Sequence, residues 1–214
     1  MNKIKNIIFD LGGVVIDLQR HKAIEALVEI GVTDAAELLG DYGQKGAFLQ
    51  LETGMMTTAE FYDSLIPKCR PGVTAVEIRD AFEKFLKRIP LSRLEMLRKL
   101  RDKGYRLYVL SNTNPLMYNH WIDAAFRGEG KTINDYFDGI VTSFQEKTCK
   151  PDPRIFRNLI ERYHLDPVHT LMLDDSEANC EAARSVGLQA IKITKDGENS
   201  FASVCEKLLN DADA

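Results

Sequence analysis

Residues 5–10, Lys-Asn-Ile-Ile-Phe-Asp, decide the fold of this chain. The run becomes wholly apolar before it ends on a carboxylate, which is typical of a strand buried on both faces of a parallel sheet. Two similar runs follow much later, at residues 105–110 and 170–173, and weaker ones lie at 139–142 and 190–193. Together these runs predict a parallel β-sheet built from distant parts of the chain.

Helical patterns lie between these runs. Apolar residues recur at helical spacing within 94–104, 152–163 and 178–187, and Gly or Asp-Pro stands where such helices end or begin. The alternation of strands and helices from about residue 91 onward implies right-handed βαβ units. The fold class that follows is α/β, with a Rossmann-like parallel sheet covered by helices on both faces.

The segment after the first strand differs from the rest of the chain. Between residues 18 and 90 the sequence carries amphipathic helical patterns without a credible strand, and Pro90 closes the segment. We therefore predict an all-helical cap domain of residues 17–90, inserted into a core formed by residues 1–16 and 91–214.

The composition excludes several classes of protein. The 214 residues include 28 Lys and Arg against 32 Asp and Glu, a net charge of −4, which disfavours a protein that mainly neutralises nucleic-acid phosphates. No stretch approaches the ~18 apolar residues of a membrane span. The four cysteines form no C-x-x-C pair, so we interpret them as reduced thiols of a cytoplasmic protein.

Polar residues follow the three best strands. Asp10 ends the first, Ser111-Asn112 the second and Asp174-Asp175 the third, and ligands of open parallel sheets bind beyond these carboxyl ends. Clustered carboxylates would repel one another unless a hard divalent cation lay between them, and Mg²⁺ prefers oxygen ligands. A carboxylate beside such an ion can also attack phosphorus as a nucleophile.

Lysine supplies the complementary charge. The ammonium of Lys150, with the Ser111 hydroxyl and the Asn112 amide, would neutralise phosphoryl oxygens as charge develops on them. Lys147 competes for this role, but the Lys-Pro context that leads into a helix favours Lys150.

Four segments carry a family resemblance. In chain order, residues 10–14 (Asp-Leu-Gly-Gly-Val), 111–112 (Ser-Asn), 150–151 (Lys-Pro) and 173–176 (Leu-Asp-Asp-Ser) resemble the four motifs of the haloacid dehalogenase (HAD) superfamily. The helical insertion after the first motif is similar to that superfamily's helical cap. The chain looks closest to the sugar-phosphate phosphatase branch, the branch of α-D-glucose-1-phosphate phosphatases.

The resemblance implies a catalytic role for each matching residue. Asp10 would be the nucleophile, forming an aspartyl-phosphate, and Lys150 would stabilise the phosphoryl group. Ser111 and Asn112 would bind that group, and the partner would be a small phosphorylated metabolite rather than a nucleic acid or a membrane.

The resemblance also implies a magnesium site. The metal group comprises Asp10, the backbone carbonyl of Gly12, Asp174 and Asp175. Whether Asp175 or Asn179 binds the ion directly, or orients it and its waters, stays open.

Position 12 departs from the family pattern. Most HAD phosphatases have Asp there, whose side chain protonates the leaving oxygen, and a general acid contributes ~10²–10⁴-fold in rate. Gly12 keeps a carbonyl but has no acid. We favour a phosphatase whose substrate has a good leaving group, such as an anomeric sugar phosphate. The alternatives are a metal-independent 2-haloacid dehalogenase and a catalytically idle binding or regulatory protein.

One segment of the insertion is a candidate for substrate contact. Residues 52–56, Glu-Thr-Gly-Met-Met, resemble the cap turn that faces the active site in relatives. Trp121 and Tyr118 could line a sugar site, but we interpret both as packing residues.

Overall fold

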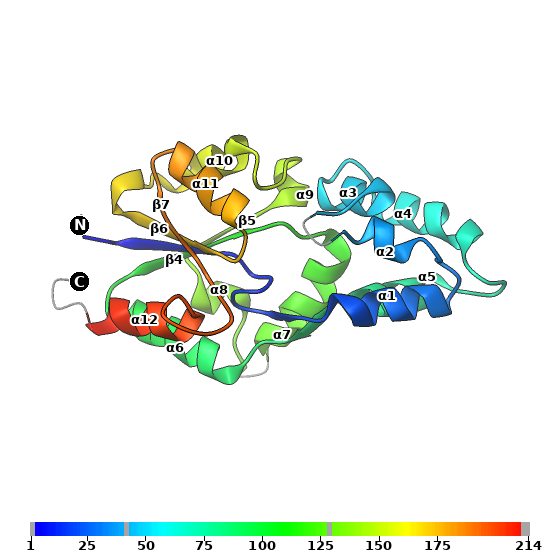
Figure 1. The fold of residues 1–214 in the computed structure, drawn as a ribbon, viewed down its shortest axis with the longest axis horizontal. Helices are drawn as coiled ribbons and strands as arrows, with labels where there is room; N and C mark the ends of the chain where they lie inside the picture. The colour runs from blue at the N-terminus through cyan, green and yellow to red at the C-terminus, as the bar shows by residue number, and fades with distance from the viewer. Residues whose placement is uncertain (1–2, 41–42, 128–129, 211–214) are drawn as a thin grey trace.

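Five parallel strands form the central sheet of the computed structural model, which describes residues 3–40, 43–127 and 130–210 (Figure 1). The strand order is β5-β4-β1-β6-β7, and all neighbouring pairs are parallel. This confirms the predicted Rossmann-like α/β fold. The strands span Asn6–Phe9 (β1), Arg106–Ser111 (β4), Gly139–Thr142 (β5), Thr170–Asp174 (β6) and Gln189–Lys192 (β7).

The first strand lies in the middle of the sheet because both of its faces are covered. All four residues of β1 are buried; Ile7 and Phe9 belong to one apolar cluster, and Ile8 belongs to the other. Phe9 pairs with Val109 of β4 and with Leu173 of β6. The residues that follow these three positions along the chain therefore reach the same edge of the sheet.

Helices cover both faces of the sheet (Figure 1). Helices α6 (Leu91–Asp102) and α12 (Phe201–Asn210) contact one another below it, and α10 (Pro153–Tyr163) and α11 (Glu177–Ser185) lie above it. The Asp152 side chain accepts a hydrogen bond from the backbone N–H of Arg154, which caps α10 as the Asp-Pro start predicts.

Short helices complete the core. Tyr118 and Trp121 are partly buried against the main apolar cluster, in agreement with their interpretation as packing residues. The short helices of the core span Met117–Ile122 (η2), Asp123–Phe126 (α7), Ile133–Tyr136 (α8), Ser143–Glu146 (α9) and Pro167–His169 (η4).

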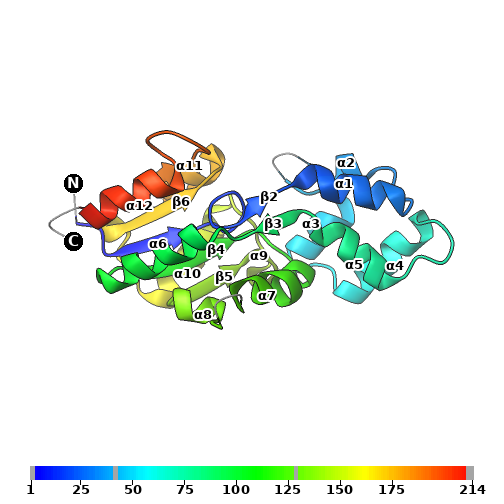
Figure 2. The ribbon, with the colours of Figure 1, turned by 90° about the horizontal axis from the view of Figure 1, so that it is seen from below.

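The inserted helices gather beyond the end of the sheet toward which the strands point (Figure 2). Their own apolar centre contains Phe48, Phe61 and Phe82, whose ring centroids lie 4.7 to 5.9 Å apart. Thr57 and Thr74 each begin a helix with a capping box. The helices span Arg20–Glu29 (α1), Ala35–Leu38 (α2), Gly46–Glu52 (α3), Thr58–Leu65 (α4), Ile66–Lys68 (η1) and Ala75–Glu83 (α5).

A two-stranded ribbon lies at the base of the insertion, where we expected helices alone. Strand β2 (Asp17–Leu18) pairs antiparallel with β3 (Leu86–Arg88). The interpretation that residues 18–90 contain no strand was therefore wrong. Strands of two and three residues are too short to show a period of two in the sequence, and only the meeting of two distant segments creates them. The division into 1–16 with 91–214 and 17–90 stays a prediction.

Two predictions from the composition also concern the structure. All four cysteines are free thiols. Within the described residues, no helix is long and apolar enough to cross a membrane.

Candidate active site

Three carboxylates meet beyond the carboxyl ends of β1 and β6. Asp10, Asp174 and Asp175 each offer a ligand atom, and these atoms all lie within 4.8 Å of one another. They converge because Phe9 and Leu173, which precede Asp10 and Asp174, are paired across the two strands. The structure thus brings together the carboxylates that the sequence analysis selected.

Lys150 bridges two of these carboxylates. Its Nζ lies 2.9 Å from Oδ1 of Asp10 and 2.6 Å from Oδ2 of Asp174, and its side chain is 1% exposed. Burial disfavours the charge of this ammonium, but attraction to the two carboxylates outweighs it and raises the pKa of Lys150. Lys147, the alternative candidate, is exposed at the end of α9 with φ of 53°.

The charge of the cluster favours a divalent cation. One ammonium stands among three carboxylates, so a negative charge remains. Burial, with further repulsion from Asp174 and Asp175, raises the pKa of Asp10, although Lys150 opposes the rise. Hard carboxylate oxygens are the donors that Mg²⁺ prefers, and the donor set therefore fits this ion.

Asp174 is held rigidly in place. It is fully buried, and its Oδ1 accepts hydrogen bonds from the backbone N–H of Ser176 and from Nδ2 of Asn179, both at 2.9 Å. Asn179 thus orients the Asp174 carboxylate in the structure. Asp175 is exposed at the rim of the site.

Ser111, the last residue of β4, and Asn112, which follows it, make different contacts. Ser111 is buried at the end of β4, and its hydroxyl makes a long, 3.5 Å contact with the carbonyl of Asn112. The side chain of Asn112 donates to the carbonyl of Lys150 at 2.9 Å and accepts from its backbone N–H at 2.8 Å. The Asn112 amide thus fixes the loop that carries Lys150, a role that sequence reasoning missed.

A second polar contact fixes the same loop region. The hydroxyl of Ser143 donates to the carbonyl of Thr113 at 2.9 Å and accepts from its N–H at 3.0 Å. Both residues are buried. Serine and threonine are common at strand ends, so the sequence contains no signal that pairs them.

The two glycines after Asp10 have different constraints. Gly13 has φ of 73°, and a Cβ on it would lie 2.2 Å from Oδ2 of Asp175. At Gly12 the three atoms nearest to an added Cβ all belong to the side chain of Leu18, with Cδ1 closest at 3.3 Å, and the backbone is outside the left-handed region. The turn therefore requires glycine at position 13, whereas nothing in its geometry requires glycine at position 12.

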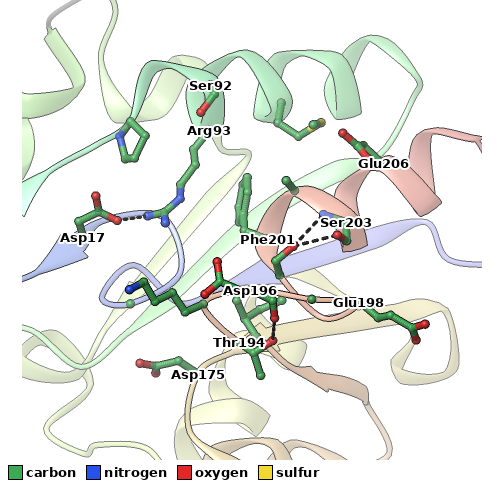
Figure 3. Close-up of a pocket in the computed structure, with 18 of the residues that line it drawn as sticks. Asp17, Ser92, Arg93, Asp175, Thr194, Asp196, Glu198, Phe201, Ser203 and Glu206 are labelled. Carbon is green, nitrogen blue, oxygen red and sulfur yellow. Dashed lines mark hydrogen bonds and ion pairs between the residues drawn. The ribbon is translucent and has the colours of Figure 1, made fainter.

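A groove of about 1680 Å³ lies next to the carboxylate cluster, and Gly13 and Asp175 are among its lining residues. Figure 3 shows Arg93 pointing toward Asp17, at 2.9 Å, and the same guanidinium lies 5.7 Å from the ring centroid of Phe201. Asp10 and Lys150 are not among its lining residues. Of the three clustered carboxylates, only Asp175 lines the groove, so the groove lies beside the cluster.

The insertion contacts the core at two places, and one of them lies in the turn of residues 52–56 that the sequence analysis singled out. A Cβ on Gly54 would lie 2.0 Å from the carbonyl oxygen of Phe144, so the turn after α3 packs directly on the core backbone. Nδ1 of His120 lies 2.9 Å from both carboxylate oxygens of Glu83, at the end of α5. Both contacts join residues that are far apart in sequence.

Comparisons with known proteins agree with this geometry. Residues 4–187 match the family model of haloacid dehalogenase-like hydrolases. A D-ribitol-5-phosphate phosphatase of Bacteroides thetaiotaomicron is 37% identical over 189 residues, which cover 88% of this chain and 91% of the relative.

Solved structures give the same result. A HAD family enzyme of B. thetaiotaomicron, in complex with magnesium and inorganic phosphate, is 36% identical with a TM-score of 0.83, covering 91% of this chain and 96% of that one. A predicted HAD-like hydrolase of Porphyromonas gingivalis is 33% identical with a TM-score of 0.87, covering 97% and 98%. The extent of these matches, together with the motifs assembled at the edge of the sheet, shows that the chain belongs to the haloacid dehalogenase-like hydrolases.

Proposed function

We propose that this hydrolase is a Mg²⁺-dependent phosphatase that releases phosphate from a small phosphomonoester through an aspartyl-phosphate at Asp10. The observation that carries the proposal is the Lys150 ammonium, which bridges Asp10 and Asp174 inside a cluster of three carboxylates. A metal-independent dehalogenase has no evident use for such a cluster. The relatives also support a phosphatase, because one is a D-ribitol-5-phosphate phosphatase and another contains magnesium and phosphate.

The metal would be held by Asp10, Asp174 and Asp175, with the carbonyl of Gly12 as a further ligand. When bound, Mg²⁺ neutralises and orients phosphoryl oxygens. The surrounding residues keep the cluster in place, since Asn179 and Ser176 fix Asp174 from behind.

The reaction on the chain's own residues has two steps. A carboxylate oxygen of Asp10 attacks phosphorus, the bond to the leaving oxygen breaks, and an acyl-phosphate forms on Asp10. Lys150 and the hydroxyl of Ser111 stabilise the charge that develops on the phosphoryl oxygens. Water then attacks the phosphorus of the acyl-phosphate, and phosphate leaves with the Asp10 carboxylate restored.

The leaving oxygen needs a proton that position 12 does not supply. The anomeric oxygen of a sugar and the oxygen of a phenol leave phosphorus with less help from an acid. A primary alcohol, such as that of D-ribitol 5-phosphate, leaves poorly without one. We propose that the substrate is a sugar phosphate. Its rate of hydrolysis should depend on how readily its leaving oxygen departs without a proton.

The test is a phosphate-release panel with Mg²⁺ and with chelator. It should contain anomeric, primary-alcohol and aryl phosphates, and Asp10→Asn is the control variant. We expect release that needs both Mg²⁺ and Asp10. Equal release by the Asp10→Asn variant would refute the mechanism, and chloride release from a 2-chloroacid with chelator present would identify a dehalogenase instead.

A further inference from the structure

Arg93 is a cation in the first turn of α6, where a helix disfavours positive charge. The first turn of α6 contains no acidic residue that would offset the positive end of the helix dipole. The Arg93 side chain is only 22% exposed, so it is not simply turned toward solvent. Departures from local preference of this kind are expected at functional sites.

The Arg93 guanidinium contacts three other groups. Its Nη1 donates to the carbonyl of Val15 at 3.2 Å and lies 2.9 Å from Oδ1 of Asp17. Its Cζ lies 5.7 Å from the ring centroid of Phe201, at the start of α12. Figure 3 shows Arg93 reaching from α6 toward Asp17, with Phe201 beside it. Arg93 thus joins α6 to α12 and to the loop that leads from β1 into β2.

A chain of hydrogen bonds runs through this loop from Val15 to Asp10. The N–H of Val15 donates to the carbonyl of Leu11 at 2.9 Å, and the N–H of Ile16 donates to the same carbonyl at 2.7 Å. The N–H of Leu11 in turn donates to Oδ1 of Asp10 at 2.8 Å. The loop is therefore closed on itself, and a displacement of Val15 moves the N–H that orients the Asp10 carboxylate.

Aromatic packing gives a second route from Arg93 to Asp10. The ring centroid of Phe201 lies 6.0 Å from that of Phe9, which immediately precedes Asp10 in the chain. Both phenylalanines are buried. Because buried side chains are close-packed, a shift of Phe201 is transmitted to Phe9. Two independent sets of contacts thus lead from the same guanidinium to the candidate nucleophile.

We propose that Arg93 is a positioning residue, which holds the loop after Asp10 so that the Asp10 carboxylate meets phosphorus in the geometry of attack. The inference rests on the proposed phosphatase function and adds a residue that lies outside the carboxylate cluster. A misplacement of about 1 Å in a reacting group can cost on the order of 10²-fold in rate. The loss should appear in kcat, because Lys150 and Ser111 still hold the phosphoryl group.

The experiment measures Mg²⁺-dependent release from phenyl phosphate by Arg93→Ala and Arg93→Lys. Arg93→Ala should lower kcat roughly tenfold to a hundredfold. Its KM should stay within about twofold of the wild-type value, because the interaction acts on the transition state rather than on substrate binding. Arg93→Lys keeps the charge but not the planar guanidinium, so its kcat should lie between those of Arg93→Ala and the wild type.

The matched control is Arg88→Ala. Nε of Arg88 lies 3.3 Å from Oδ2 of Asp17, the carboxylate that Arg93 also contacts, but the Arg88 side chain is 67% exposed. Exposed ion pairs contribute little, so kcat of this variant should stay within about twofold of the wild-type value.

Guanidinium ion provides a readout that a purely structural role would not move. Arg93 lines the groove beside Asp175, so the space left by Arg93→Ala is open to solvent. Millimolar guanidinium chloride should restore part of the kcat of Arg93→Ala, with saturation, and should leave Arg88→Ala unchanged. Because guanidinium lowers the free energy of unfolding, it does not restore activity that was lost through instability. Thermal melting verifies that each variant is folded, and Arg93→Lys serves for the comparison if Arg93→Ala is not.

Each other outcome overturns the inference in a recognisable way. A kcat of Arg93→Ala equal to that of the wild type would show that the loop needs no such contact. A loss that neither guanidinium nor Arg93→Lys restores means that Arg93 only supports the fold. An equal loss in Arg88→Ala means that the charge near Asp17 matters rather than the position of the loop. Absence of Mg²⁺-dependent release from phenyl phosphate by the wild type contradicts the proposed function itself.

Discussion

Gly13 and Asp175 are distant in the chain but lie against one another in the candidate active site, where a Cβ on Gly13 would lie 2.2 Å from Oδ2 of Asp175. The loop after β1 therefore packs directly on the residue that follows β6. Because Gly13 also has φ of 73°, two separate constraints, backbone conformation and space, exclude any side chain there.

Gly13→Ala should therefore impair both folding and the metal site. The left-handed backbone alone costs about 1–2 kcal/mol for a residue with a Cβ, and the new methyl group must displace Asp175. Gly72→Ala is the matched control, because Gly72 has φ of 87° and a Cβ on it would meet no other atom within 4 Å. Thermal melting should show a larger loss for Gly13→Ala, and titration with Mg²⁺ should show weaker binding in that variant alone. Equal melting temperatures in the two variants would contradict the close approach.

Lys150→Met should lose stability in a manner that Mg²⁺ partly restores. Removing one partner of a buried ion pair costs about 3–5 kcal/mol, and here it leaves three carboxylates without the ammonium. An added divalent cation supplies the missing charge, so Mg²⁺ should raise the melting temperature of the variant more than that of the wild type. Lys147→Met, an exposed lysine close in sequence, should melt like the wild type.

The same variant should lose activity. A stabilising group for developing charge is worth about 10²–10³ in kcat. Phosphate release measured at saturating Mg²⁺ separates this effect from metal loss. Activity within a few-fold of the wild type would show that Lys150 neutralises the cluster without serving the reaction.

Gly12→Asp should fold and should broaden the range of leaving groups. The atom closest to the new Cβ is Cδ1 of Leu18, at 3.3 Å, and Leu18 is 37% exposed, so a small shift of its side chain accommodates the Cβ. A carboxyl placed there can protonate the leaving oxygen, and general acids contribute up to ~10⁴-fold. We expect kcat/KM to rise for primary-alcohol phosphates and to change little for aryl phosphates. Gly12→Ala, which adds a Cβ without an acid, should raise kcat/KM for neither class of phosphate.

Glu52 should make stability depend on pH in a defined direction. Because burial raises its pKa to about 7 from an ordinary value of 4.5, the folded protein retains a proton that the unfolded chain releases. Unfolding then becomes easier as pH rises through this window, and below it the effect vanishes. Glu52→Gln removes the penalty, which is of the order of 3 kcal/mol. The stability of the variant minus that of the wild type should increase between pH 5 and pH 8 in denaturant titrations, and a difference that is constant with pH would contradict the buried ionisation.

Much of the core could be predicted because its signals are local. Each apolar run is long enough to indicate a strand, and Asp10, Ser111 and Asp174 follow such runs directly. In a parallel sheet their meeting at one edge is then a geometric consequence. The choice of Lys150 over Lys147 also rested on a local context, and Lys150 is the one that contacts the cluster.

Other features could not be predicted because they depend on which distant segments meet. Strands β2 and β3 are too short to show periodicity and exist only as a pair. The Asn112 side chain hydrogen-bonds the Lys150 backbone, and the Glu52 carboxyl lies against Cys149. Both contacts join segments that are distant in the chain.

The sequence by itself determined the α/β core, the order of the motifs and the carboxylates that gather at the sheet edge, because periodicity and strand ends are properties of neighbouring residues. Only the tertiary structure decided that Lys150 bridges Asp10 and Asp174, that Gly13 rather than Gly12 must be glycine, and that the buried Glu52 lies against Cys149. Burial and pairing depend on the packing of the whole chain, and no short stretch of residues contains them.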